Sequence, residues 1–116
     1  MDFIFKELKD GGCPWHLHDK IAIAAEEVFI NIADYAYNPD VGSAIIRIKV
    51  DKDVIIEFED TGKPFNPLEA ADPDLSAGAA SRDIGGLGIY MVKKIMDSAE
   101  YRHEDGKNIL VIRKTF

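Results

Sequence analysis

The sequence predicts an α+β fold: a two-layer α/β sandwich with helices on one face of a mixed, mostly antiparallel sheet. Three observations support this. The chain has 116 residues, the usual size of one domain. Apolar residues make up 47% and charged residues 30%, a balance typical of folded globular proteins. The hydrophobic periodicity reads, in order, as helix, two strands, long loop, helix and two strands.

The first third of the chain predicts one main helix. Residues 1–8 alternate weakly, which indicates a short strand or a frayed end, and Gly11, Gly12 and Pro14 then break the pattern. Over 18–37 apolar residues recur at steps of three and four and predict a helix, with Asp19 as its cap and Asn38-Pro39 as its stop. The apolar stripe of this helix consists of Ile21, Ala24, Ala25, Val28, Ile32 and Ala36.

Two strands follow, over 43–50 and 54–60, because apolar and polar residues alternate with a period of two. Residues 51–53 join them as a hairpin loop. In the second strand Val54, Ile56 and Phe58 share one face, which we expect to be covered. The outer side chains of the first strand are basic and those of the second acidic, so we expect ion pairs across the two.

The segment 61–84 has no period and contains three prolines and a run of small residues at 76–81, so we expect a long loop that is functional or mobile. A second helix is predicted over 87–96, with Ile89, Val92 and Met96 on its inner face. Residues 98–104 and 108–116 predict a final hairpin that turns at Asp105-Gly106.

Composition narrows the function classes. The formal net charge is −7 and no Lys/Arg cluster is present, which argues against a nucleic-acid binder. No apolar run approaches a membrane span, and the single cysteine, Cys13, suits a reducing compartment, so we expect a cytoplasmic protein. We interpret Cys13 as an inert small side chain, and His16 and His18 as residues that pack in a loop rather than bind metal.

Three features are candidates for a binding site. Glu27 and Asn31 lie four residues apart, at the edge of the apolar stripe, where they either line a cleft or are ordinary polar residues on the helix surface. Asp60 has the parity of the covered strand face, so its carboxylate either accepts a hydrogen bond from an exocyclic amine such as that of adenine or turns into water at the strand end. The glycine cluster 85–88 stands directly before the second helix and is either a phosphate site or a hinge.

The order of these features resembles that of the GHKL ATPase superfamily, which includes DNA gyrase, sensor histidine kinases and the anti-sigma-factor serine kinases. Glu27-Val28-Phe29-Ile30-Asn31 is similar to the N box of that family. Residues 60–65 (DTGKPF) are similar to its G1 box, and residues 85–92 (GGLGIYMV) to its G2 box. The resemblance implies one histidine-kinase-like ATPase domain over 1–116, of the Bergerat type, with a shortened N-terminal region and an ATP lid at about 63–84.

The resemblance also implies roles for individual residues. Asn31 would ligate Mg²⁺, Glu27 would act as general base, and Asp60 would bind the adenine amine while Gly62 leaves room for the base. The resemblance implies three further contacts with the nucleotide. The phosphates would be contacted by Gly85, Gly86, Leu87 and Gly88. Arg82 would reach the γ-phosphate or is simply a solvated charge of the lid, and Thr115, near the end of the last strand, would place a hydroxyl near the adenine.

Within that family the chain is most similar to the anti-sigma-factor serine/threonine kinases, because histidine kinases usually carry Asn where Glu27 stands. The resemblance implies a kinase that uses ATP and Mg²⁺ and regulates a sigma factor by partner switching. The partners of such a kinase would be a sigma factor, an anti-anti-sigma protein of STAS type, or both. The resemblance also allows that the protein forms a homodimer. Two alternatives remain: a non-catalytic ATP- or ADP-binding module that sequesters a protein, and a detached histidine-kinase catalytic domain.

Overall fold

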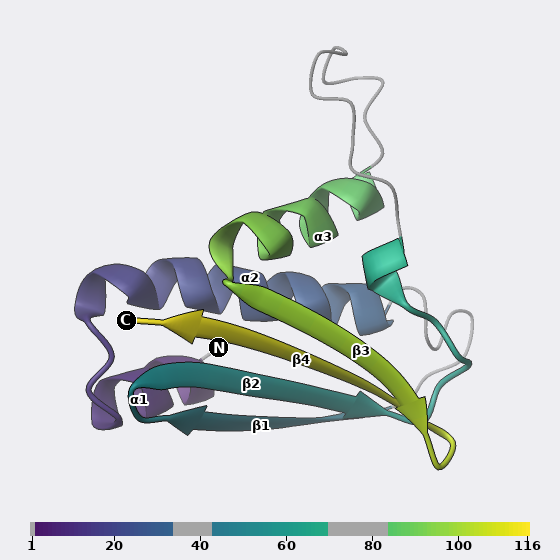
Figure 1. Ribbon diagram of the computed structural model, residues 1–116, viewed down its shortest axis with the longest axis horizontal. Helices are drawn as coiled ribbons and strands as arrows, with labels where there is room; N and C mark the ends of the chain where they lie inside the picture. Colours follow the sequence, from purple (N-terminus) through teal and green to yellow (C-terminus); the bar gives the residue numbers. More distant parts are fainter. Residues whose placement is uncertain (1, 34–42, 70–83) are drawn as a thin grey trace.

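The structure is a computed structural model and describes residues 2–33, 43–69 and 84–116, with the backbone alone at 84–87 (Figure 1). Its α-helices are α1 (Asp2–Asp10), α2 (His18–Asn31) and α3 (Ile84–Ile95). Its strands are β1 (Ala44–Val50), β2 (Asp53–Asp60), β3 (Ser98–Glu104) and β4 (Lys107–Thr115). Two short 3₁₀ turns, η1 (Trp15–Leu17) and η3 (Pro67–Glu69), complete the described elements.

The four strands form one sheet in the order β1-β2-β4-β3, and each neighbouring pair is antiparallel. The helices lie on one face of this sheet, with α2 across its middle and α3 beside α2 (Figure 1). The predicted two-layer α/β sandwich is therefore confirmed.

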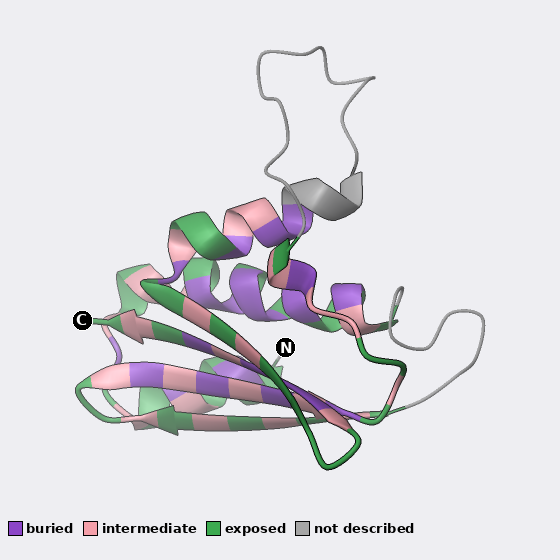
Figure 2. Cartoon of the chain, turned by 45° about the vertical axis from the view of Figure 1, so that its right-hand side comes forward, coloured by how far each residue is buried: buried purple, intermediate pink, exposed green. Residues whose placement is uncertain are grey.

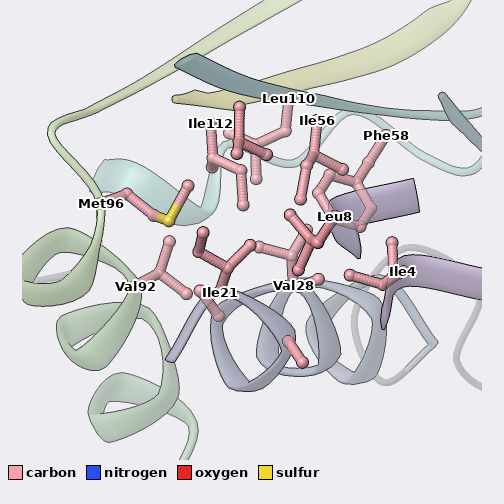
Figure 3. Packing of buried hydrophobic residues seen from close by; sticks show 14 of the residues in the cluster. Ile4, Leu8, Ile21, Val28, Ile56, Phe58, Val92, Met96, Leu110 and Ile112 are labelled. Carbon is pink, nitrogen blue, oxygen red and sulfur yellow. The ribbon is translucent and has the colours of Figure 1, made fainter. Parts of the chain in front are cut away.

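The hydrophobic core fills the space between the helices and the inner face of the sheet (Figure 3). Along β2 every second residue is buried, and Figure 2 shows this alternation as bands of colour. Burying one such aliphatic or aromatic side chain contributes about 1.5–3 kcal/mol. The largest fully buried side chains come from all three helices and the two central strands: Ile4, Leu8, Ile21, Val28, Val92, Val54, Ile56, Phe58 and Ile112.

The N-terminal prediction is wrong, because residues 2–10 form helix α1 rather than a strand or a frayed end. Ile4 and Leu8 lie one helical turn apart and are 1% and 0% exposed, so the helix is held by the core. A Schellman motif ends it: Cys13 N–H donates to Leu8 O and Gly12 N–H to Lys9 O, with Gly12 at φ 82°.

Helix α2 begins at His18, as predicted, but Asp19 does not cap it. The N-cap position is Leu17, which makes no side-chain cap hydrogen bond. Asp19 lies in the first turn, where its negative charge interacts favourably with the positive end of the helix dipole. The α-helix is described to Asn31 with a π-type turn at 32–33. The predicted stop at Asn38-Pro39 and the stripe residue Ala36 lie outside the described residues.

The β1–β2 hairpin has the predicted alternation and charge pairing. Arg47 lies opposite Glu57, and its Nη1 donates to Glu57 Oε2 at 2.9 Å and to Glu59 Oε1 at 3.3 Å. These pairs lie on the face of the sheet that none of the described helices covers, and exposed ion pairs contribute only about 0–1 kcal/mol each. The β3–β4 hairpin turns at Asp105-Gly106, also as predicted. None of the helices in the described part of the chain is long and apolar enough to cross a membrane.

Candidate functional site

A pocket that opens to solvent lies where the C-terminal end of α2 meets the ends of β2 and β4. Its walls are mainly apolar, with three polar side chains, Asn31, Asp60 and Asn108, and the Tyr101 phenol among them. The residues that line it are Val28, Asn31, Ile32, Phe58, Asp60, Phe65, Pro67, Tyr101, Asn108 and Leu110. This composition is typical of a small-molecule site.

Asp60, the last residue of β2, lies in this pocket with only 4% of its surface exposed. Gly62 N–H donates to its Oδ1 at 2.9 Å, closing an Asx turn, and Asn108 Nδ2 donates to the same oxygen at 2.9 Å. The predicted inward direction of Asp60 is confirmed, and the alternative of a carboxylate turned into water is wrong. Among the described residues both hydrogen bonds end on Oδ1, which leaves Oδ2 as an acceptor.

Asn108 on β4 is a site residue that the sequence analysis missed. It pairs directly with Asp60 in the sheet and is 5% exposed. Its parity along β4 is that of Leu110 and Ile112, which are also buried, so the same period-of-two argument that singled out Asp60 would have found it.

Asn31, the last α-helical residue of α2, lines the same pocket and is 9% exposed. Within residues 2–33, 43–69 and 84–116, no hydrogen bond ends on its side-chain amide. A buried amide without a partner costs about 1–3 kcal/mol, so a ligand that satisfied it would be stabilised there. The structure thus brings Asn31 and Asp60 to one pocket from two distant segments.

Glu27 lies one turn before Asn31 on α2 and is half-buried, but it faces α3 rather than the pocket wall. A β-carbon added at Gly88 would come within 2.5 Å of Glu27 Oε2 and 3.5 Å of its Cδ. The carboxylate therefore occupies the space that a side chain at position 88 would need. The N-box acid and the glycine-rich segment meet at this contact between α2 and α3.

The glycine cluster lies inside α3, not before it, because the helix begins at Ile84 rather than at the predicted residue 87. Gly85 and Gly86 belong to the first turn and Gly88 follows it. Backbone N–H groups of a first helical turn have no acceptor within the helix, and they carry its positive dipole end. The first turn of α3 can therefore bind an anion such as a phosphate. Arg82 and residues 70–83 of the predicted lid lie outside the described residues.

Comparison with known proteins decides the family. A profile described as the histidine kinase-like ATPase domain matches residues 2–114. The chain belongs to this family.

The relatives of this ATPase domain include named protein kinases. The serine/threonine-protein kinase BtrW of Bordetella bronchiseptica is 26% identical over 95 residues, which is 79% of this chain and 66% of the relative. The serine-protein kinase RsbW of Bacillus mycoides is 25% identical over 118 residues, 97% of this chain and 68% of the relative. RsbW of Bacillus cereus strain AH187 is 29% identical over 100 residues, 82% of this chain and 62% of the relative. The chain spans about two thirds of the length of the relatives it matches.

The structure does not bring Thr115 to the pocket of this histidine kinase-like ATPase domain. Thr115 pairs with Asp53 at the far end of β2, seven residues or roughly 24 Å of strand from Asp60. Its N–H and its hydroxyl both donate to Asp97 Oδ2, each at 2.6 Å. These bonds, with Lys114 nearby, lower the pKa of Asp97 to about 2. Thr115 therefore joins the end of β4 to the α3–β3 connection, which is a structural role.

The side chains of His18 and Cys13 pack locally, whereas His16, which was expected to pack in a loop, is exposed. His18 Nε2 lies 2.8 Å from the Cys13 carbonyl oxygen, and burial raises the pKa of the Cys13 thiol. In the described part of the ATPase domain, no three His, Cys, Asp or Glu residues lie close enough together to hold a metal ion.

Proposed function

We propose that this domain is an ATP- and Mg²⁺-dependent serine/threonine protein kinase of the anti-sigma-factor type, which regulates a sigma factor by partner switching. The observation that carries the proposal is the arrangement of three polar residues. Asn31 and Asp60 line one pocket, and Glu27, one turn from Asn31, places its carboxylate against α3. Relatives of this chain are named serine-protein kinase and serine/threonine-protein kinase, which supports the same function.

The pocket residues fit an adenine nucleotide with its metal. Asn31 has a buried amide without a hydrogen-bond partner among the described residues, and amide oxygens are ligands that Mg²⁺ accepts alongside phosphate oxygens and waters. When bound, Mg²⁺ neutralises charge on the phosphates. Asp60 accepts the adenine amine through Oδ2, and the first turn of α3 offers N–H groups to the phosphates. The chain as a whole carries a net charge of −7, which repels a negatively charged nucleotide at long range. Binding therefore depends on these local hydrogen-bond donors and on the metal.

Glu27 is the residue that distinguishes a kinase from a nucleotide-binding module in this proposal. A serine or threonine hydroxyl needs a base, and a carboxylate within reach of it takes the proton as the oxygen attacks. The new bond forms between that oxygen and the γ-phosphorus, while the bond from the γ-phosphorus to the β–γ bridging oxygen breaks and ADP leaves. The proton moves to the Glu27 carboxylate.

The protein partners follow from the proposed class. The substrate would be a small anti-anti-sigma protein of STAS type, phosphorylated on serine or threonine, and the second partner would be a sigma factor. Both would be met in the cytoplasm.

The test is phosphoryl transfer from γ-labelled ATP-Mg²⁺ to a candidate partner, with phosphoamino-acid analysis of the product. We expect phosphoserine or phosphothreonine, and a rate that falls roughly 10²- to 10⁴-fold in Glu27→Gln. The matched control is Glu26→Gln, which makes the same change at the neighbouring, exposed acid and should leave the rate unchanged. Tight ATP binding without transfer would favour the binding module, and phosphohistidine on the partner would favour the detached histidine-kinase domain.

A further inference from the structure

We propose that the free edge of β1 binds an extended segment of a partner protein in which apolar side chains alternate with acidic ones. β1 is an outermost strand of the sheet, and no strand in the described part of the chain pairs with its other side (Figure 1). Alternate backbone N–H and C=O groups of β1 therefore point away from the sheet, where an added strand can meet them. None of the described residues that line the nucleotide pocket belongs to β1, so the inference does not depend on the function proposed above.

The side chains of β1 that face the helices are only half-buried. Ile46, Ile48 and Val50 pack against the core from this strand, whereas every second residue of β2 is fully buried. The end of α1 contacts β1 on this face, at Val50, but a helix cannot continue the ladder. A further strand beside β1 would remove more of this apolar surface from water if its own side chains on the same face were apolar.

The open face of β1 specifies the charge of the partner. Arg47 and Lys49 lie on this face, and β1 contains no acid. Arg47 is paired with Glu57, but Lys49 lies opposite Ile55 and makes no ion pair within the described residues. Opposite charges on directly opposed residues of neighbouring strands stabilise a sheet, and like charges destabilise it. An incoming strand is therefore favoured if it carries acids on its open face.

The same charges argue against a second copy of β1 as the occupant. Two β1 strands side by side would bring Arg47 and Lys49 of one copy next to the same basic residues of the other. The strand that fits both faces instead has apolar residues toward the helices and acids toward solvent. Such a segment alternates with the period of two that an extended chain requires.

The opposite edge of the sheet, formed by β3, has the composition of a protected edge. Glu100, Arg102 and Glu104 lie on its open face, and Arg102 Nε donates to Glu104 Oε2 at 3.0 Å. Charged side chains of this kind keep edge strands from pairing with other chains. Apart from its two basic residues β1 is entirely aliphatic, which distinguishes it as the edge that accepts a strand.

The test uses peptides of seven residues, the length of β1, with blocked ends. In the first peptide valine alternates with glutamate, and in the second valine alternates with lysine. The third repeats the first with every backbone amide methylated, which removes its N–H donors. Calorimetry measures the dissociation constants, and hydrogen–deuterium exchange locates the contact on the domain. The variant is Lys49→Glu, and the matched control is Lys52→Glu, the same change at an exposed lysine in the β1–β2 turn.

We expect the wild-type domain and Lys52→Glu to bind the glutamate peptide more tightly than the lysine peptide, with slower amide exchange over 44–50. The methylated peptide should not bind. In Lys49→Glu the affinity for the glutamate peptide should fall roughly three- to thirtyfold, because a favourable cross-strand pair becomes an unfavourable one, and the preference should move toward the lysine peptide. If Lys49→Glu does not fold, Lys49→Gln carries the comparison, with a smaller change in the same direction.

Four results would overturn the inference. The first is no binding of the glutamate peptide at about 1 mM, and the second is equal binding of its methylated twin. The third is a folded Lys49 variant that keeps the wild-type preference between the glutamate and lysine peptides. The fourth is slower exchange elsewhere than over 44–50: protection of 98–104 would assign strand addition to β3. A domain that dimerises and protects 44–50 without any peptide would likewise overturn it, by assigning the edge to a second copy.

Discussion

The carboxylate of Glu27 on α2 lies against Gly88 on α3, with its Oε2 at 2.5 Å from the point where a β-carbon at position 88 would stand. The absence of a side chain at 88 is what lets the acid lie there. This contact joins the N-box helix to the helix whose first turn contains Gly85 and Gly86. A side chain introduced at position 88 should therefore displace the Glu27 carboxylate and leave the rest of the fold largely unchanged.

For Gly88→Ala we expect a slower phosphoryl transfer with little loss of stability. The new methyl group meets the end of a flexible side chain, so Glu27 moves aside, and alanine in a helix gains about 0.5–1 kcal/mol over glycine. Transfer should fall about tenfold or more, and the thermal midpoint should stay near that of the wild type. Combining Gly88→Ala with Glu27→Gln should add nothing to the Glu27→Gln loss. A fully additive double variant would show that Gly88 does not act through Glu27.

Asn31→Ala should weaken nucleotide binding only when the metal is present. Its amide is buried without a partner among the described residues, so removing it costs the folded protein little. We expect the affinity for ATP-Mg²⁺ to fall about tenfold or more, measured by calorimetry. In EDTA the variant and the wild type should bind ADP alike. An equal loss with and without metal would contradict the assignment of Asn31 as a magnesium ligand.

The pKa of Asp97 predicts a stabilising contact that is lost in acid. Hydrogen bonds from Thr115 lower this pKa from its ordinary 3.8 to about 2. A lowered folded-state pKa contributes stability above pH 3.8, and that contribution disappears as the pH falls toward 2. Asp97→Asn should therefore be less stable than the wild type near neutral pH, with the gap closing between pH 4 and pH 2.

Urea unfolding at several pH values measures that gap. Asp105→Asn is the control, because Asp105 lies in an exposed turn at φ 53°, a conformation that asparagine adopts readily. The difference in unfolding free energy between Asp105→Asn and the wild type should not close between pH 4 and pH 2. Since Thr115 lies far from the pocket, Asp97→Asn should also leave ATP affinity unchanged, and a changed affinity would contradict the placement of Thr115.

Leu8→Ala tests the helix that the sequence did not predict. Leu8 is fully buried between α1 and the core, so its truncation should cost about 2–5 kcal/mol of unfolding free energy. Phe3→Ala, on the same helix but with Phe3 49% exposed, should cost much less. Chemical denaturation of both variants makes the comparison. Equal effects would contradict a packed α1.

The strands and the inward direction of Asp60 were predictable because side chains with a period of two alternate strictly between the two faces of a sheet. Val54, Ile56 and Phe58 fixed the inner side of β2, and Asp60 followed by parity. Helix α1 was not predictable in the same way, because Phe3 and Phe5 imitate the alternation of a strand while the buried residues, Ile4 and Leu8, are only two.

Pairing between strands was the part that local patterns could not supply. Thr115 and Asn108 lie on the same strand, and only the antiparallel register of β4 against β2 shows that Asn108, not Thr115, stands beside Asp60. The start of α3 was placed late because three glycines lower helix propensity there. The helix forms despite them, held by Ile89 and Val92 in the core.

We propose above that Asn31 and Asp60 form the binding site of an adenine nucleotide and its metal. A crystal structure of the domain with a non-hydrolysable ATP analogue and Mg²⁺ tests it most directly. We expect the adenine amine on Oδ2 of Asp60, the metal on the amide oxygen of Asn31, and phosphates at the first turn of α3. A nucleotide bound outside this pocket, or a metal held without Asn31, would contradict it.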